Sequence, residues 1–300
     1  MHLPIVHSPL YRAELPGDHR FPMAKFGRLA DLLLADGLAG PGGFHDAAEA
    51  PAEWIALAHD RAYVDQVFNG EVPERIAREI GFPMSASVRR RARASVGGTV
   101  LTARLALEHG IACNTAGGSH HARRAHGAGF CVFNDVAVAI RVLQADGMIE
   151  RALVIDLDVH QGDGTADIFA GDASVTTVSV HAARNYPVRK VAGDIDIGLD
   201  DDTGDAAYLD LVRRLVPAAI ADARPDIVFY NAGVDPHRDD RLGRLGLSDK
   251  GLSERDHWVI DAVRSRGIAL AGVIGGGYCS DVDVLAKRHA GLHRVASAFC

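Results

Sequence analysis

The chain has 300 residues, 48% of them hydrophobic and 24% charged, which is typical of a globular protein that buries a full core. Its net charge of −7 argues against general binding to nucleic acid. No apolar run approaches the ~20 residues needed to span a bilayer, and no signal-peptide core begins the chain, so we expect a cytoplasmic protein without membrane contact.

The N-terminal third is predicted to be mainly helical. Pro22 is placed to begin a helix, and Gly37 and Gly110 are placed to end two others. Pro73 and Gly81 interrupt the helical pattern between them. In chain order we expect a strand at 3–6, a helix at 22–36, a short strand and an amphipathic helix within 54–69, a loop-rich excursion at 71–87 and a long helix at 88–109.

From residue 111 onward, strands and helices alternate. The expected strands are 111–114, 152–158, 175–180, 226–231 and 268–274. The expected helices are 134–147, 165–170, 205–222 and 253–266, with a long loop at 181–204. Repeated βα units predict an α/β fold with a mainly parallel sheet covered by helices on both faces. We find no repeat and no linker, so residues 1–300 are expected to form one domain.

The segment 152–164 is the most informative stretch of the chain. It begins as an apolar, β-branched run, which is typical of a strand buried on both faces. Asp156, Asp158 and His160 follow with one parity, so they project from one face if the extended geometry continues. Buried carboxylates and imidazoles are costly unless partners or a metal satisfy them. Since open α/β sheets bind ligands at this edge, the segment predicts a metal site.

Three further polar clusters follow predicted strands. They are GGSHH (117–121), NAGVD (231–235) and GGGY (275–278). Taken alone, each could be an ordinary turn, and the three glycines lack the Lys-Ser/Thr of a phosphate-binding loop. Because the carboxyl ends of parallel strands meet at one edge, the clusters together supply the parts of a metal-assisted hydrolase.

The residue types suggest a role for each cluster. The side chains that would hold the ion, with one position left open, are Asp158, His160 and Asp235. Two carboxylates and an imidazole nearly cancel a divalent charge, so the ion acidifies water less and a separate base is useful. The His120–His121 pair supplies that base, and Tyr278 is a neutral donor for an oxyanion.

The motifs resemble those of the zinc-dependent histone deacetylase family. In the family's order they are GGSHHA (117–122), GFCVFND (129–135), DLDVHQGDG (156–164), NAGVD (231–235) and GGGY (275–278). The segments that resemble the class IV branch and its bacterial relatives are HRFPMAKF (19–26), NYP (185–187) and DRLGRL (240–245). The resemblance implies the arginase/deacetylase fold, a three-layer α/β/α domain.

The resemblance also implies roles for single residues. It makes His121 the general base and acid, His120 its electrostatic partner and Tyr278 the group that polarises the scissile carbonyl. Asp156 and Asp163 match the carboxylates that orient the two histidines. The ion at Asp158, His160 and Asp235 would be Zn²⁺, with Fe²⁺ as an alternative.

Two more sites follow from the same resemblance. A structural K⁺ or Na⁺ is expected at Asp156, Asp158, the carbonyl of His160 and Ser179. The residues expected to line the acyl-lysine tunnel are Gly129, Phe130, Tyr186 and Gly277.

The implied reaction is hydrolysis of an N-acyl-lysine amide, in which metal-bound water attacks the carbonyl. Residues 80–85 hold no acid where deacetylases acting on histone peptides commonly carry an aspartate, which leaves room for small N-acyl amines. Polyamine deacylation is therefore an alternative. A two-manganese ureohydrolase and a non-catalytic acyl-lysine binder are further alternatives, although a binder has no use for a base.

Other reactive side chains are expected to be structural. The four cysteines form no CxxC pair, which indicates reduced thiols, and Cys131 is interpreted as a packed thiol. His59 and His257 lie on predicted helices as ordinary surface or partly buried imidazoles. The basic run at 89–93 is interpreted as a solvated helix face.

Overall fold

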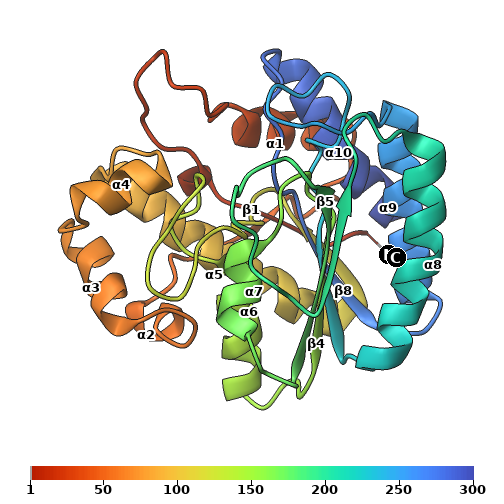
Figure 1. Ribbon diagram of the computed structural model, residues 1–300, viewed down its shortest axis with the longest axis horizontal. Coiled ribbons are helices and arrows are strands. Elements are labelled where there is room, and N and C mark those ends of the chain that lie inside the picture. Colours follow the sequence, from red (N-terminus) through yellow and green to blue (C-terminus); the bar gives the residue numbers. More distant parts are fainter. Residues whose placement is uncertain (1) are drawn as a thin grey trace.

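The centre of the fold is a sheet of eight parallel strands (Figure 1). In the computed structural model, which describes residues 2–300, the strand order is β2-β1-β3-β8-β7-β4-β5-β6. The strands are β1 (Ile5–His7), β2 (His45–Asp46), β3 (Ile111–Asn114), β4 (Ala152–Asp156), β5 (Val175–Ala182), β6 (Ile195–Leu199), β7 (Ile227–Asn231) and β8 (Ala269–Val273). Every residue of β3, β4, β7 and β8 is buried, as expected for central strands covered on both faces.

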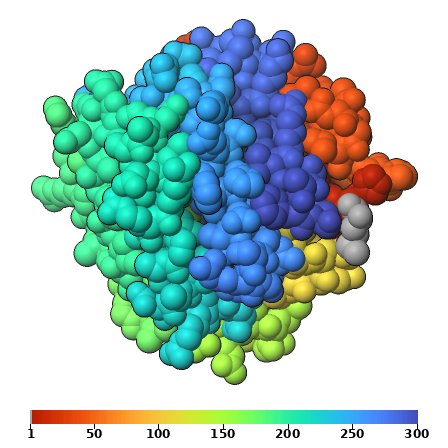
Figure 2. All heavy atoms as spheres, turned by 90° about the vertical axis from the view of Figure 1, so that its right-hand side faces the viewer, coloured from red at the N-terminus to blue at the C-terminus, as the bar shows by residue number. Residues whose placement is uncertain are grey.

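Helices cover both faces of this sheet. The helices are α1 (Lys25–Ala35), α2 (Ala52–Ile55), α3 (Arg61–Asn69), α4 (Glu74–Ile80), α5 (Ala86–His109), α6 (Asp135–Ala145), α7 (Asp163–Phe169), α8 (Asp205–Ala223), α9 (Asp249–Arg264) and α10 (Val282–Ser297). One layer contains α5, α6 and α7, and the other contains α8, α9, α10 and α1. Figure 2 shows α8, α9 and α10 side by side on the second face. Among residues 2–300, no helix is long and apolar enough to cross a membrane.

The alternation of strands and helices after residue 111 is confirmed. The strands predicted at 111–114, 175–180, 226–231 and 268–274 are β3, β5, β7 and β8. The helices predicted at 22–36, 88–109, 134–147, 165–170, 205–222 and 253–266 are α1, α5, α6, α7, α8 and α9. Side-chain caps explain where two of them begin, since Ser85 accepts from Val88 and Asn134 from Ala137.

Three predicted segments were wrong. The short strand expected near residue 54 is helix α2, and the excursion at 71–87 contains helix α4. Pro73 precedes α4 and Gly81 ends it with a φ of 78°, so residues that we interpreted as loop signals delimit a helix. The loop predicted at 181–204 contains the end of β5 and edge strand β6, whose side chains are at most half-buried and give a weak apolar signal.

The strand predicted at 152–158 ends two residues earlier, at Asp156. Beyond it the chain turns, because the Asp156 carboxylate accepts from the N–H of Asp158 and the Asp158 carboxylate accepts from the N–H of His160. The alternation expected from an extended strand therefore does not hold over 157–160. The polar side chains nevertheless converge, through these turns.

Candidate active site and metal centre

The candidate site lies at the carboxyl ends of four neighbouring strands, β3, β8, β7 and β4. The loop after β3 carries the histidine pair, and the loop after β4 carries Asp158 and His160. Asp235 follows β7, and Tyr278 follows β8. These four strands are not consecutive in sequence, so the sheet order brings the clusters together.

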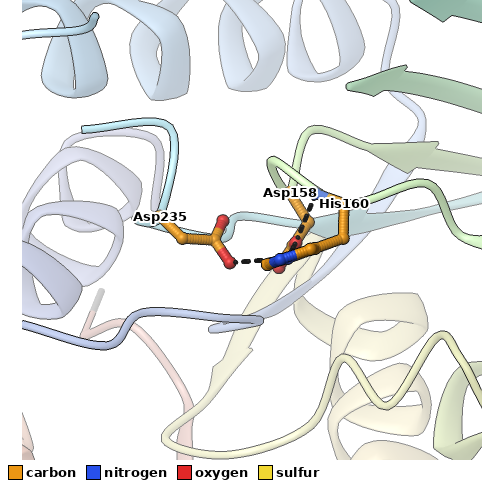
Figure 3. A group of neighbouring side chains, drawn as sticks. All are labelled: Asp158, His160 and Asp235. Atoms are coloured by element: carbon orange, nitrogen blue, oxygen red, sulfur yellow. Dashed lines mark hydrogen bonds and ion pairs between the residues drawn. The ribbon is translucent and has the colours of Figure 1, made fainter. Parts of the chain in front are cut away.

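Asp158, His160 and Asp235 point toward one another (Figure 3). One potential ligand atom from each lies within 4.8 Å of the others, and all three side chains are buried. The Nδ1 atom of His160 is 3.0 Å from Oδ1 of Asp158 and 3.2 Å from Oδ2 of Asp235. Among residues 2–300, this is the one group of histidine, cysteine and acidic side chains close enough to hold a metal.

Backbone donors fix the two carboxylates. Asp158 Oδ2 accepts from the N–H of Gly276 at 2.7 Å, and Asp235 Oδ1 accepts from the N–H of Val159 at 2.9 Å. A side chain at position 276 would collide with Oδ2 of Asp235, so only glycine allows this close approach of the backbone. The ligand groups are therefore held before any ligand arrives.

The buried cluster calls for a positive charge. Oδ2 of Asp235 is fully buried and accepts no hydrogen bond from the described residues, although Nδ1 of His160 lies 3.2 Å away. Burial lowers the pKa of His160, but the adjacent carboxylates of Asp158 and Asp235 outweigh burial and raise the pKa to about 10. A proton on this imidazole balances the negative charge of the two carboxylates, and a metal cation between them would do the same. An oxygen, oxygen and nitrogen donor set fits a divalent ion such as zinc.

The two adjacent histidines lie beside this cluster, with ring centroids 4.1 Å apart. Nδ1 of His120 bonds to Asp156 Oδ2 at 2.6 Å, and Nδ1 of His121 bonds to Asp163 Oδ1 at 2.6 Å. Because an ionised carboxylate only accepts, each Nδ1 carries the hydrogen. Both predicted orienting carboxylates thus contact the histidines that we assigned to them, and Nε2 of His121 is left as an acceptor.

Different surroundings separate the two imidazoles. Burial lowers the pKa of His120, but the carboxylates of Asp156 and Asp158 outweigh burial and raise the pKa to about 9. Burial lowers the pKa of His121 to about 4, helped by the neighbouring charge on His120 and opposed by Asp163. The pair therefore combines a charged and a neutral imidazole near pH 7. Arg123 supports this state, because its guanidinium bonds to Asp163 Oδ2 at 2.8 Å.

Tyr278 closes another side of the site. Its ring is perpendicular to that of His160, with centroids 6.2 Å apart. Burial raises the pKa of its phenol well above 10, and the carboxylates of Asp235 and Asp158 add to the shift, so the hydroxyl stays protonated. The N–H of Tyr278 donates to Asp240 Oδ2 at 2.7 Å, which fixes the residue on its loop.

Aromatic rings form the walls of the approach. The ring of Tyr186 is perpendicular to His121 at 4.8 Å, and the ring of Phe130 lies 5.9 Å from that of Tyr278. Phe130 adopts a φ of 65°, which is strained for a bulky residue. Two backbone bonds hold this conformation, from Gly129 to the carbonyl of Glu79 and from Phe130 to that of Ile80.

The glycine loop after β8 differs in detail from the expected tunnel. Gly276, not Gly277, lines the hollow beside the carboxylates. A side chain at Gly277 would instead point at Val234 and His289, away from the tunnel. Gly277 is therefore not among the residues that the structure brings to the tunnel wall.

The predicted monovalent-cation residues are also neighbours. Asp156 and Ser179 are directly paired across β4 and β5, and Asp158 lies two residues beyond Asp156. Asp156 is already well bonded, since its Oδ1 accepts from Asn231 at 3.0 Å and its Oδ2 bonds to His120. A K⁺ or Na⁺ ion at this place, held also by the carbonyl of His160, stays a prediction.

Sequence reasoning missed several supporting residues. Lys25 is buried behind the glycine loop, and its Nζ donates to the carbonyls of Gly275 at 3.3 Å and Gly277 at 3.5 Å. Burial lowers the pKa of Lys25 to about 8. Asn231 and Asp240 contact Asp156 and Tyr278, as described above. Lys25 and Asp240 both lie in segments noted for their resemblance, which was the available signal.

His59 also differs from its prediction. It lies in the turn between α2 and α3, not on a helix, and it is buried. Its Nδ1 donates to the carbonyl of Arg123 at 2.8 Å, and its Nε2 accepts from the N–H of Asn134 at 2.9 Å. The imidazole therefore ties down both ends of the segment that carries Phe130.

Comparison with known proteins identifies relatives along almost the whole chain. Residues 19–291 match the histone deacetylase domain. An uncharacterized protein of Picosynechococcus is 45% identical over 296 residues, which cover 99% of both chains. Histone deacetylase 2 of Arabidopsis thaliana is 30% identical over 303 residues, which cover 97% of this chain and 78% of that protein.

A solved structure agrees with these relatives. The crystal structure of the HDA15 HD domain matches with a TM-score of 0.79 and 21% sequence identity, over 99% of this chain and 88% of that one. At this identity the likeness shows the fold, and it confirms the predicted arginase/deacetylase architecture.

Proposed function

This chain belongs to the histone deacetylase family, and from that membership we propose that it is a metal-dependent lysine deacylase. Family membership supports hydrolytic deacylation in general. The finer proposal is that one catalytic domain cleaves the amide between an acyl group and the side-chain nitrogen of lysine, in a protein or a peptide. A cytoplasmic location stays a prediction.

One observation carries this proposal. Two buried carboxylates and an imidazole come within 4.8 Å of one another, beside a pair of carboxylate-bound histidines and a phenol. Asp158, His160 and Asp235 would hold Zn²⁺ or Fe²⁺, which supplies Lewis-acid polarisation of the carbonyl and acidifies water when bound. Oδ2 of Asp235 fits this assignment, because it is buried without accepting a hydrogen bond and a cation would satisfy it.

His121 is the proposed proton carrier. Its Nδ1–H is engaged by Asp163, so Nε2 faces the site as the basic atom. A low pKa keeps this ring neutral at pH 7, so Nε2 can accept a proton from the attacking water. A new C–O bond forms, the C–N bond breaks, and the proton goes to the leaving amine. His120 stays charged beside the carboxylates and stabilises negative charge as it develops.

Tyr278 is the proposed donor to the carbonyl oxygen. Its phenol keeps its proton, because burial and the nearby carboxylates disfavour the phenolate. A fixed O–H donor stabilises an oxyanion more than it stabilises the ground-state carbonyl. The aromatic walls at Phe130 and Tyr186 would enclose the aliphatic stem of the acyl-lysine and keep water away.

We expect the purified chain to bind one divalent ion and to release acid from acyl-lysine peptides. A panel of peptides with acyl chains from acetyl to myristoyl, each assayed with and without a chelator, tests this. Activity that is lost with the chelator and restored by Zn²⁺ or Fe²⁺ supports the proposal. Absence of turnover on every peptide, together with absence of a bound metal, would contradict it.

Two alternatives separate when acetylated polyamines are added to this panel of substrates. A polyamine deacylase would prefer acetylated polyamines to every peptide, and a non-catalytic binder would retain acyl-lysine without releasing acid. The third alternative, a two-manganese ureohydrolase, needs a second metal site. Among residues 2–300 the described side chains offer one metal-binding group.

A further inference from the structure

The mouth of the catalytic hollow has a positively charged rim. The hollow has a volume of about 400 Å³ and runs from His121, His160 and Tyr278 to the surface. Its lining includes four arginines, Arg20, Arg78, Arg184 and Arg244, but one acid, Glu79. We use "rim" for these five residues. The whole chain has a net charge of −7, so this local excess of arginine is not a consequence of composition.

Neighbouring carboxylates do not cancel the charge of the rim. A single aspartate, Asp201, faces both Arg244 at 3.0 Å and Arg184 at 3.9 Å. Glu79 is already paired with Arg75 at 2.6 Å, so it does not neutralise an arginine of the rim. Arg78 faces Glu74 at 3.7 Å, with both side chains largely exposed, and such pairs are weak.

Arg20 is the rim cation best placed to meet a ligand. It is exposed, and no carboxylate of residues 2–300 forms an ion pair with it. Its guanidinium lies over the ring of Phe130, 5.3 Å from the ring centroid. Because Phe130 forms the wall of the hollow, the guanidinium stands where a substrate enters.

The backbone around Arg20 is held in place. His19 bonds to the carbonyl of Gly81 at 2.9 Å and stacks on Phe82, and Phe21 is buried on the other side. This anchoring limits the positions that the guanidinium can reach. A guanidinium that is attached to a fixed backbone and has free donors can form two parallel hydrogen bonds to one carboxylate.

We infer that the rim selects N-acyl amines that carry carboxylates near the acylated nitrogen, and disfavours basic ones. The inference rests on the proposed function, and it adds the charge of the substrate. Acyl-lysines flanked by aspartate or glutamate fit this rim, as does free acyl-lysine through its own carboxylate. Acetylated polyamines and lysine-rich peptides meet like charge at the mouth.

Matched peptides test the inference. Three acyl-lysine peptides of equal length differ only in flanking residues, which are aspartate, alanine or lysine, and a fourth substrate is free acyl-lysine beside its amide. We expect kcat/KM to fall by about 5- to 10-fold from the acidic to the neutral peptide and further to the basic one. The preference for the acidic peptide should shrink in about 0.5 M NaCl, because salt then screens charges that are more than about 4 Å apart.

Variants assign the effect to the rim. Arg20→Gln should reduce the ratio of kcat/KM for the acidic peptide to kcat/KM for the basic peptide by about 3- to 5-fold. Arg20→Lys should restore part of this ratio, because the positive charge returns. Arg214→Gln is the control for loss of an exposed arginine outside the rim, since Arg214 is 72% exposed. Arg214 lies on α8, on the opposite side of the molecule from α4 (Figure 1).

The outcomes separate the inference from the proposed function. Equal turnover of all peptides, or a preference for the basic one, overturns the charged-rim inference and leaves deacylation standing. Absence of turnover on every substrate overturns the proposed function and the inference with it. If free acyl-lysine and its amide are equivalent while the peptides differ, the relevant carboxylates are those of flanking residues, and the inference holds for peptides.

Discussion

The charged side chains of the catalytic centre are buried, whereas those of its rim are exposed. In the centre the histidines and the carboxylates are buried and lie against named partners, as His121 lies against Asp163. At the rim, guanidinium groups such as Arg78 and Arg244 are exposed by 73% and 55%. A buried charge is expensive to misplace, whereas an exposed one is screened. The centre can therefore fix the chemistry, while the rim can only bias the choice of substrate.

The two regions also differ in what positions them. Strands β3, β4, β7 and β8 end at the centre, and their spacing is fixed by hydrogen bonds of the sheet. The rim is built from the end of α4 and from loops around residues 20, 184 and 244. Substitutions in the centre should thus cost orders of magnitude in turnover, and substitutions at the rim should cost factors of a few.

The largest expected effect is that of Asp235→Asn. The amide keeps an oxygen for the N–H of Val159, but it removes the charge and the second oxygen. We expect the variant to lose its divalent ion and at least ~10³-fold in turnover, because a metal supplies most of the polarisation. Elemental analysis and acyl-lysine turnover measure this. Asp239→Asn, at an aspartate that is 64% exposed on the same loop, is the control and should retain both.

The next effect is that of Tyr278→Phe, which removes a hydroxyl and leaves the ring packing intact. Loss of one oxyanion donor should lower kcat by ~10²-fold or more with little change in metal content. Tyr208→Phe is the control, because Tyr208 is a buried tyrosine outside the site and its hydroxyl has no hydrogen-bond partner among residues 2–300. Undiminished turnover in Tyr278→Phe would remove the phenol from the mechanism.

The smallest effect at neutral pH concerns the segment that joins the centre to the rim. Burial lowers the pKa of His59 to about 4 from 6.5, and the neutral ring holds Arg123 and Asn134. Below pH 6.5 the unfolded chain binds a proton at His59 and the folded chain does not. The free energy of unfolding therefore falls as the pH drops from 6.5 to about 4, by up to ~3 kcal/mol from this group.

Denaturant unfolding at a series of pH values tests this dependence. His59→Gln should be less stable at pH 7 because it loses the fitted ring, but its stability should fall less steeply below pH 6.5. His257→Gln, at an exposed position, should keep the parental slope. Identical slopes in the parent and His59→Gln would contradict the role of His59.

The sequence predicted the centre more fully than the rim. Asp158, His160 and Asp235 were chosen as candidates because several polar clusters follow predicted strands, whose carboxyl ends meet at one edge of a parallel sheet. Arg20 and Arg244 gave no such signal, since exposed arginines are common and their clustering depends on loops that are far apart in sequence. The sequence also did not distinguish Gly276 from Gly277, because a run of glycines does not reveal which of them contacts the carboxylates.

Local pattern by itself determined the βα alternation and placed the candidate metal ligands and the histidine pair directly after predicted strands, because each of these depends on residue types at short spacing. The carboxylates that bond to the two histidines lie 36 and 42 residues away from them, and the family resemblance suggested them. Tertiary structure alone decided that β3, β8, β7 and β4 are neighbours, that the chain turns after Asp156, and that four arginines surround one opening. The physical reason is that strand order and loop packing depend on contacts between distant segments, which periodicity along the chain does not encode.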